Sequence, residues 1–187
     1  MKLTEYTSVI FRQHVGRFIV HFNKYEIIDS TTREIIGIVK TNMMFIPFIR
    51  GSTKFYDTHS EDPIFYLKEK SHFLSRKYVL NDQFSRTIGK LSVWFFKIKN
   101  NLKVLDQTTG FEYEINLKDP EGKVINKNEQ HVASIIQTQD RITKGPRDVE
   151  KYKVEIHEEE VSSSNLPVLL LAGTVLIDQI FVHEKVF

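Results

Sequence analysis

The feature that most constrains this chain is an apolar run near its C-terminus, Leu166–Phe181, with the sequence LPVLLLAGTVLIDQIF. Ser164 and Asn165 are good N-cap residues, and Pro167 would lie in the first turn, where its missing N–H costs nothing. We therefore predict a helix over residues 166–183. Because apolar residues lie on all its sides, such a helix must be buried all round. The rest of the chain is expected to wrap around it.

A membrane-spanning helix is the alternative interpretation of this run. Spanning a bilayer takes about 20 apolar residues, whereas this run is shorter and contains Gly173, Asp178 and Gln179. A secretory signal is not expected either, because Glu5 and Arg12 interrupt the only apolar stretch before residue 17. We therefore predict a cytoplasmic protein that is not transmembrane, and we leave attachment to the periphery of a membrane open.

Asp178 would place a carboxylate inside this apolar helix. A buried charge must be paired or neutralised, so we predict a structural role for Asp178. A Lys, Arg, hydroxyl or backbone N–H from the surrounding strands should lie within hydrogen-bonding distance. The alternative is that Asp178 emerges at the end of the barrel, where water solvates it.

The remainder of the chain consists of short β-type runs separated by turn-prone residues. Strands of about five to eight residues with regular turns are typical of an antiparallel sheet or barrel. The predicted strands are 24–29, 34–40, 53–57, 64–70, 76–82, 87–98, 102–106, 112–117, 132–137 and 151–156.

Several of these hairpins form a weak internal repeat, as in YEIIDSTTREIIGIVK, KFYDTHSEDPIFYLKEK and KYVLNDQFSRTIGKLSV. A strand ends in Asp or Asn, a polar turn follows, and the next strand carries apolar residues and often a Lys. Repeated hairpins need neighbours to cover their apolar faces. We therefore predict a mainly β fold, a closed antiparallel β-barrel around the central hydrophobic C-terminal helix.

Charge is distributed unevenly along the chain. Residues 1–105 hold 17 Lys and Arg against 9 Asp and Glu, whereas residues 106–187 hold 9 against 15. The two halves could simply attract each other within one domain. The alternative is a basic surface for an anionic partner, for which the candidate residues are Lys68, Lys70, Lys90, Lys97 and Lys99.

No motif in the chain indicates catalysis or a cofactor. Cysteine is absent, which excludes disulfides, thiolate metal sites and a thiol nucleophile. There is no glycine-rich phosphate loop and no G-x-S-x-G elbow, and the seven histidines lack metal-ligand spacing. We predict no catalytic residue, no metal and no cofactor, and a protein that is not an enzyme. Nucleic acid is not an expected partner, since a pI near 8.6 and an acidic second half do not suit it.

Two apolar segments each allow two interpretations. The run Val93–Phe96 is interpreted as part of a central strand, with an exposed aromatic edge beside Lys97 and Lys99 as the alternative. The segment Met43–Ile49 contains Pro47, which argues against a regular central strand. We expect it to be a loop that covers the core, and the alternative is an exposed contact with a membrane or a partner.

The hairpin repeat followed by an apolar helix resembles the tubby C-terminal-like superfamily, which includes phospholipid scramblases and the LURP-one-related proteins. The nearest local match is the segment Leu176–Phe181, LIDQIF, because scramblase-type members carry a similar Leu-Ile-Asp-x-x-Phe in their central helix. The resemblance covers residues 17–187 and leaves residues 1–16 as an N-terminal extension. It implies a barrel of about twelve strands around the helix.

The resemblance also implies an association with membranes, because tubby domains bind phosphoinositides and scramblases move lipids in a calcium-dependent way. Lys68-x-Lys70 and Lys97-x-Lys99 are loose counterparts of the basic pair that tubby domains use on phosphates. The segment Glu158–Glu160 takes the place of the scramblase calcium segment but lacks its Asp-x-Asp spacing, so calcium binding stays open.

Three functions follow from these observations, in order of preference. The first is a non-catalytic module that binds anionic phospholipid head groups or a membrane surface. The second is a regulatory or interaction protein with a protein partner and no lipid role. The third is a scramblase-like activity.

Overall fold

The computed structural model describes residues 3–14, 22–42, 52–71, 75–94, 101–116, 121–138, 149–157 and 165–184. Twelve strands and one helix make up this part of the chain. The strands are β1 (Ser8–His14), β2 (Phe22–Asp29), β3 (Ile35–Asn42), β4 (Ser52–Asp57), β5 (Phe65–Ser71), β6 (Ser75–Asp82), β7 (Thr87–Trp94), β8 (Asn101–Asp106), β9 (Glu112–Asn116), β10 (Glu121–Asn126), β11 (His131–Gln137) and β12 (Val149–Ile156). The helix is α1 (Leu166–Glu184).

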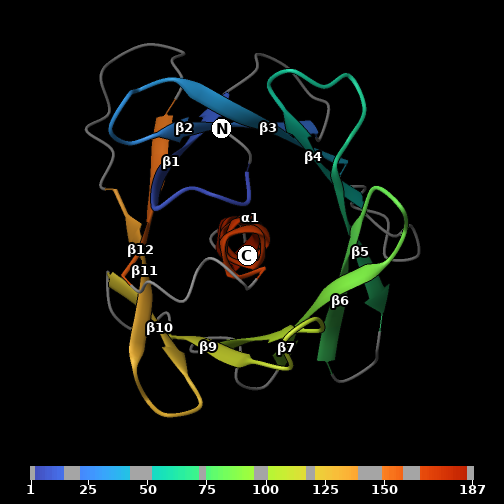
Figure 1. Ribbon diagram of the computed structural model, residues 1–187, viewed down its shortest axis with the longest axis vertical. Helices are drawn as coiled ribbons and strands as arrows, with labels where there is room; N and C mark the ends of the chain where they lie inside the picture. The colour runs from blue at the N-terminus through green and yellow to red at the C-terminus, as the bar shows by residue number, and fades with distance from the viewer. Residues whose placement is uncertain are drawn as a thin grey trace.

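The twelve strands form one closed barrel (Figure 1). Each strand pairs antiparallel with its neighbours in the chain, and β1 closes the ring by pairing with β12. In this last pair Val9 lies opposite Val154. The predicted fold class, a mainly β closed antiparallel barrel with a C-terminal helix, is therefore confirmed.

The barrel includes part of the segment that we expected to precede it. Residues 1–16 were interpreted as an extension, yet Ser8–His14 is β1 and pairs with both β2 and β12. Val9 and Phe11 of β1 are buried in the core. Arg12 interrupts the apolar pattern, but it lies near Glu26 of β2, 3.8 Å from guanidinium nitrogen to carboxylate oxygen. The barrel cannot close without this strand.

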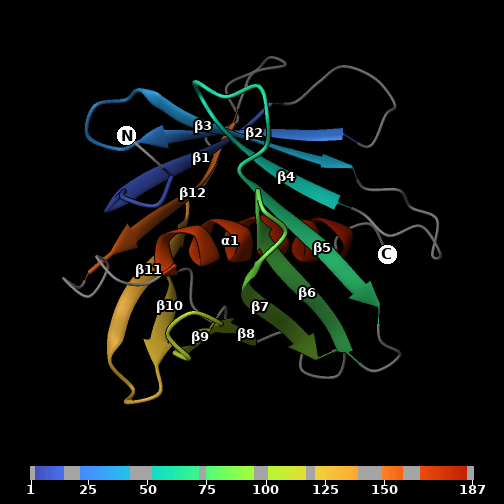
Figure 2. The ribbon, with the colours of Figure 1, turned by 45° about the vertical axis from the view of Figure 1, so that its right-hand side comes forward.

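Helix α1 passes through the centre of the barrel (Figures 1 and 2). It begins where predicted, at Leu166, and ends one residue later than predicted. From Leu166 to Asp178 every residue whose exposure is described is buried. One strand comes especially close, because a Cβ on Gly89 of β7 would lie only 2.1 Å from Cδ2 of Leu169. A side chain at this position would collide with the helix.

The helix start is held by polar groups of the barrel. The backbone N–H of Asn165 donates to Oδ2 of Asp106 at 2.9 Å, and its side-chain Nδ2 donates to Oδ1 at 3.1 Å. A carboxylate at this place also interacts favourably with the positive end of the helix dipole. Tyr6 donates from its hydroxyl to the carbonyl of Pro167 at 2.7 Å. These contacts attach the start of the helix to one end of the barrel.

The internal repeat has a physical basis in the hairpin turns. In four of the strands that end in Asp or Asn, Oδ1 of that residue accepts a backbone N–H from two residues further along, at 2.8–2.9 Å. The four residues are Asp29, Asp82, Asp106 and Asn126. Each turn then needs one residue with a positive φ, and these residues are Arg33, Ser85, Gly110 and Glu129. Asp and Asn suit these places because their short side chains bond to the backbone of the turn.

The acid stability of the fold should depend on Asp82. Burial alone would raise the pKa of this carboxyl, but hydrogen bonds from Arg86 and Phe84 outweigh it and lower the pKa. The pKa of Asp82 in the folded protein therefore lies below the unfolded value of about 3.9. The ionised carboxylate stabilises the fold fully above about pH 3.9, and this stabilisation is lost as the pH falls through the pKa of the folded protein. Asp82→Asn should cost about 1–3 kcal/mol at pH 7 and much less at pH 2.

Urea unfolding of the unchanged protein and of Asp82→Asn, each at pH 7 and at pH 2, checks this expectation. Asp62→Asn is the matched control, since Asp62 is exposed on another turn and its carboxylate accepts no hydrogen bond within the described residues. A loss of stability for Asp82→Asn that is equal at the two pH values would contradict it.

Candidate functional site

Five lysines project from the outer side of four adjacent strands, β5 to β8. Side chains alternate between the inside and the outside of the barrel along each strand. Leu67, Leu91 and Val104 point inward and are buried, so the residues next to them in the chain point outward. We name the outward set the lysine face, and each of its side chains is exposed. Its members are Lys68, Lys70, Lys77, Lys90 and Lys103.

The strand register brings these lysines together. Lys70 lies opposite Lys77 across β5 and β6. Val79 lies between Lys68 and Lys90 and is opposite both. Cations therefore neighbour one another over four strands.

Three of the five lysines predicted from the sequence are on this face. They are Lys68, Lys70 and Lys90, whereas Lys97 and Lys99 lie outside the described residues. Lys77 and Lys103 were missed. Alternation along β6 and β8 would have placed both on the outer side, but only the register shows that they join the predicted lysines.

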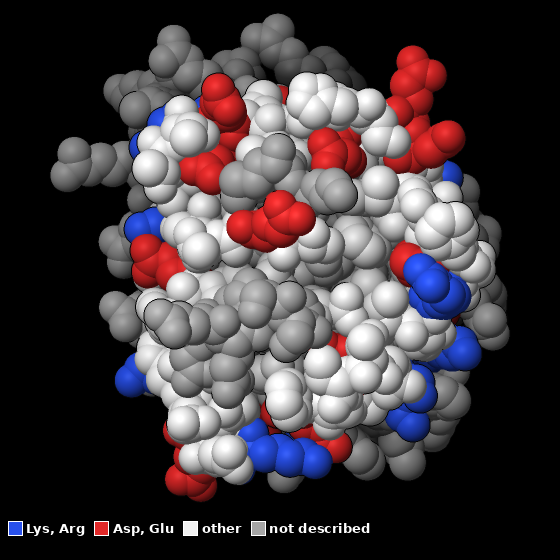
Figure 3. All heavy atoms as spheres, in the orientation of Figure 1, with Lys and Arg blue, Asp and Glu red and all other residues white. Residues whose placement is uncertain are grey.

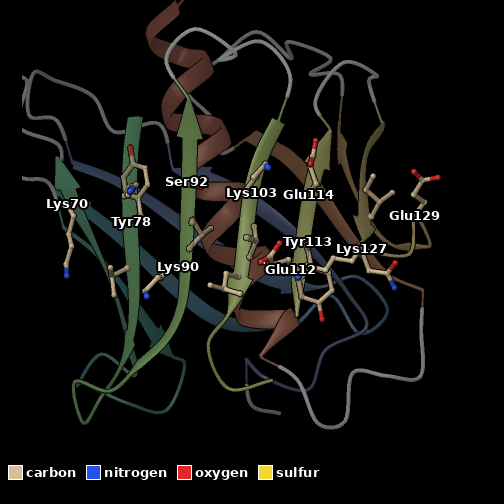
Figure 4. A pocket seen from close by; sticks show the side chains of 17 residues that line it. Lys70, Tyr78, Lys90, Ser92, Lys103, Glu112, Tyr113, Glu114, Lys127 and Glu129 are labelled. Carbon is tan, nitrogen blue, oxygen red and sulfur yellow. Dashed lines mark ion pairs between the residues drawn. The ribbon is translucent and has the colours of Figure 1, made fainter. Parts of the chain in front are cut away.

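A groove of about 660 Å³ runs along the outer side of β6 to β10 beside these lysines. Figure 4 shows Lys70, Lys90 and Lys103 on one side of this groove and glutamates on the other. Those glutamates are Glu112, Glu114 and Glu129. The groove therefore has a basic side and an acidic side.

The electrostatics of the two sides differ. Among the described residues, no lysine of the lysine face lies within ion-pairing distance of a carboxylate. By contrast, Glu112 pairs with Lys127 at 3.4 Å and Glu114 accepts a hydrogen bond from Asn101. No contact ion pair therefore neutralises these lysines, although Lys103 lies opposite Glu114 across β8 and β9.

Further lysines extend the basic surface around the barrel. Lys24, Lys40 and Lys54 lie opposite one another across β2, β3 and β4. The ammonium of Lys40 lies 4.5 Å from the ring centroid of Tyr56. This cation–π contact holds the charge on the outer surface.

Asp178 lies in a polar cluster near the other end of the helix. Its Oδ2 accepts from the hydroxyl of Tyr25 at 2.5 Å, and its Oδ1 lies 3.0 Å from the ammonium of Lys151. These are the kinds of partner that we expected for a buried carboxylate. The Asp178 side chain is 3% exposed and that of Lys151 is 21% exposed, so the ion pair is almost fully desolvated on one side.

Tyr78 is a second buried phenol of the barrel interior. Burial and the charge of Glu69 raise its pKa to about 12, against an opposing effect of Arg76. Arg76 and Glu69 form an ion pair of 3.8 Å beside it. At neutral pH Tyr78 is therefore a neutral hydrogen-bonding group.

The structure also brings together two histidines that the sequence had not linked. Nε2 of His131 and Nε2 of His157 each lie 3.0 Å from the hydroxyl oxygen of Ser134, which is buried. The pairing of β11 with β12 causes this approach. In the described ranges no group of three or more His, Cys, Asp or Glu is placed to hold a metal ion.

Several sequence predictions fall outside the described residues. They concern the segments Met43–Ile49 and Glu158–Glu160 and the side chains of Phe95 and Phe96. Val93 lies within β7 and is buried, as expected for a residue of a core strand. No helix of the described ranges is long and apolar enough to cross a membrane.

Comparison with known proteins does not assign a family. No family model, curated protein or solved structure matches the chain.

Proposed function

We propose that this chain is a non-catalytic member of the tubby C-terminal-like superfamily that binds anionic phospholipid head groups through the lysine face. A barrel of twelve antiparallel strands with an apolar C-terminal helix supports the family, as does the LIDQIF segment in that helix. We propose a cytoplasmic protein that attaches to the membrane periphery.

One observation carries the proposed activity, namely five exposed lysines on four adjacent strands without carboxylate partners among the described residues. Each Lys near an anionic membrane contributes about 1 kcal/mol. Five together would give about 5 kcal/mol, which corresponds to a dissociation constant of about 0.2 mM. Affinity of this size suits reversible attachment to a membrane.

The other candidate functions receive less support. A protein partner in place of lipid would need an anionic surface of its own to match five lysines. Scramblase-like activity would need a calcium site, and the segment that takes the place of the scramblase calcium segment, Glu158–Glu160, lacks the ligand spacing.

Sedimentation with vesicles tests the proposal. Vesicles that contain phosphatidylserine or a phosphoinositide should pellet the protein at low salt, and vesicles of phosphatidylcholine alone should not. The double variant Lys77→Gln/Lys90→Gln removes two of the five charges. It should weaken binding about 30-fold, since each charge is worth about 1 kcal/mol. Physiological salt should weaken binding as well, because it screens exposed charges beyond about 8 Å.

The matched control is Lys123→Gln/Lys153→Gln, which removes the same charge from β10 and β12. Both lysines lie away from the lysine face. Two results would overturn the proposal: equal, negligible sedimentation with anionic and neutral vesicles at low salt, or an equal loss of binding in the control variant.

A further inference from the structure

The end of the barrel where the helix begins differs in charge from the lysine face. We name it the hairpin end, and it consists of residues 3–7, 29–35, 57–64, 82–87, 106–112 and 126–131. These ranges hold Glu5, Asp29, Glu34, Asp57, Glu61, Asp62, Asp82, Asp106, Glu112 and Glu129, against the basic residues Arg33, Arg86 and Lys127. Figure 3 views this end and shows acidic side chains across it, with basic ones near its edges. The hairpin end would repel an anionic membrane.

Exposed apolar side chains are concentrated at the same end. Among the described residues, the exposed large hydrophobic side chains are Ile35, Phe84 and Phe111, at 41%, 69% and 49% exposure. Phe84 and Phe111 lie on hairpin turns, and Ile35 is the first residue after one. Phe84 is the most exposed of the three, and it lines a groove at this end.

A groove of about 930 Å³ lies at the hairpin end, next to Phe84. It lies between the N-terminal segment, the turns 57–64 and 82–87, and the start of the helix. Its apolar lining includes the partly buried side chains Ile64, Phe65 and Ile88. A volume of this size can accept several side chains of a peptide.

Two carboxylates line the groove, and they differ in their partners. Asp82 is engaged by the Arg86 guanidinium at 2.7 Å and by backbone N–H groups of its turn. Oδ1 of Asp57 accepts only long hydrogen bonds, from the hydroxyl of Thr58 and from the backbone N–H of His59, each at 3.4 Å. Its Oδ2 has no hydrogen-bond partner among the described residues. Asp57 can therefore receive a cation at the groove.

We propose that this groove binds a segment of a partner protein in which a Lys or Arg is adjacent to an apolar side chain. The cation would pair with Asp57, and the apolar side chain would pack on Phe65, Ile88 and Phe84. The net negative charge of the hairpin end attracts such a segment. This site goes beyond the proposed function, because the lysine face lies on the outer side of the strands and both sites can be occupied together.

A peptide array on the full-length protein tests this proposal at physiological salt. One set of peptides carries Lys or Arg next to Leu, Phe or Trp. A second set replaces the basic residue with Glu, and a third replaces the apolar residue with Ser. The protein should bind the first set and neither of the others. Fluorescence anisotropy with the best peptide of the first set then gives dissociation constants for the variants.

Asp57→Asn and Phe84→Ala should each weaken binding about tenfold, the size expected when a charged hydrogen bond or an apolar contact is lost. Asp57→Asn keeps the acceptor for the turn, and Phe84 is mostly exposed, so neither should change the thermal unfolding temperature. The matched controls are Asp62→Asn and Phe111→Ala, which lie on hairpin turns but do not line the groove. They should bind as the unchanged protein does.

Three results would overturn the proposal. The first is that the protein binds all three peptide sets equally well. The second is that Asp62→Asn and Phe111→Ala weaken peptide binding as much as Asp57→Asn and Phe84→Ala do. The third is self-association that Asp57→Asn or Phe84→Ala abolishes, because the occupant would then be a second copy of the chain. None of these results depends on whether the lysine face binds vesicles.

Discussion

A chain that ends at residue 164 should not fold. Eight Leu, Val and Ile residues of α1 are fully or almost fully buried in the barrel. Burying a side chain of this kind contributes about 1.5–3 kcal/mol, so the eight together contribute on the order of 12–24 kcal/mol. A typical domain has a total stability of only about 5–15 kcal/mol. Without the helix the barrel would also enclose an apolar cavity that nothing fills.

Near-UV circular dichroism and denaturant unfolding check this expectation. The truncated chain should lack both a near-UV signal from ordered aromatic side chains and a cooperative unfolding transition. A point variant gives a graded test, because Leu169→Ala should cost about 2–5 kcal/mol through the cavity that it leaves. Phe84→Ala, on an exposed turn, should cost under about 0.5 kcal/mol. A truncated chain with a native-like transition would show that the helix is peripheral.

The elements predicted best are those whose signal lies within one short segment. The helix was predicted because residues 166–177 are apolar on all sides, which only full burial explains. The Asp and Asn repeat was visible because each side chain bonds within its own turn. Two strands were missed for the opposite reason. β1 contains Arg12 and Gln13, and β10 begins with Glu121 and Gly122.

The site was predicted less completely because it depends on register. Lys68, Lys70 and Lys90 were named from the sequence, but Lys77 and Lys103 join them only through the pairing of β5 to β8. A shift of one residue in any of these pairs would turn a lysine inward. No local pattern determines that pairing. For the same reason the hairpin end could not be recognised as one acidic surface.

The partners of Asp178 show the same limit. Their chemical kind was predictable, since a carboxylate in an apolar helix requires a cation or a donor. Their identity was not, because Tyr25 lies 153 residues away and Lys151 lies 27 residues away. Both are brought to the helix by β2 and β12, the two strands that flank β1 in the barrel.

Replacing Lys151 should destabilise the protein more than replacing Asp178. Lys151→Met leaves the Asp178 carboxylate buried with only the Tyr25 hydroxyl as a partner among the described residues, and loss of one partner of a buried pair costs about 3–5 kcal/mol. Asp178→Asn leaves the ammonium of Lys151, whose side chain is 21% exposed. Because a lysine can extend its charge to water, this second loss should be smaller.

The double variant Lys151→Met/Asp178→Leu separates the ion pair from the packing around it. Removing both charges avoids an unpaired buried group, so the double variant should be more stable than Lys151→Met alone. Lys153→Met is the matched control on the same strand. Its ion pair with Glu155 is exposed at 38% and 31%, and exposed pairs contribute under about 1 kcal/mol. Urea unfolding of the four variants gives the free energies. If Lys151→Met costs no more than Lys153→Met, the pair with Asp178 does not stabilise the barrel, and water must reach the Asp178 carboxylate.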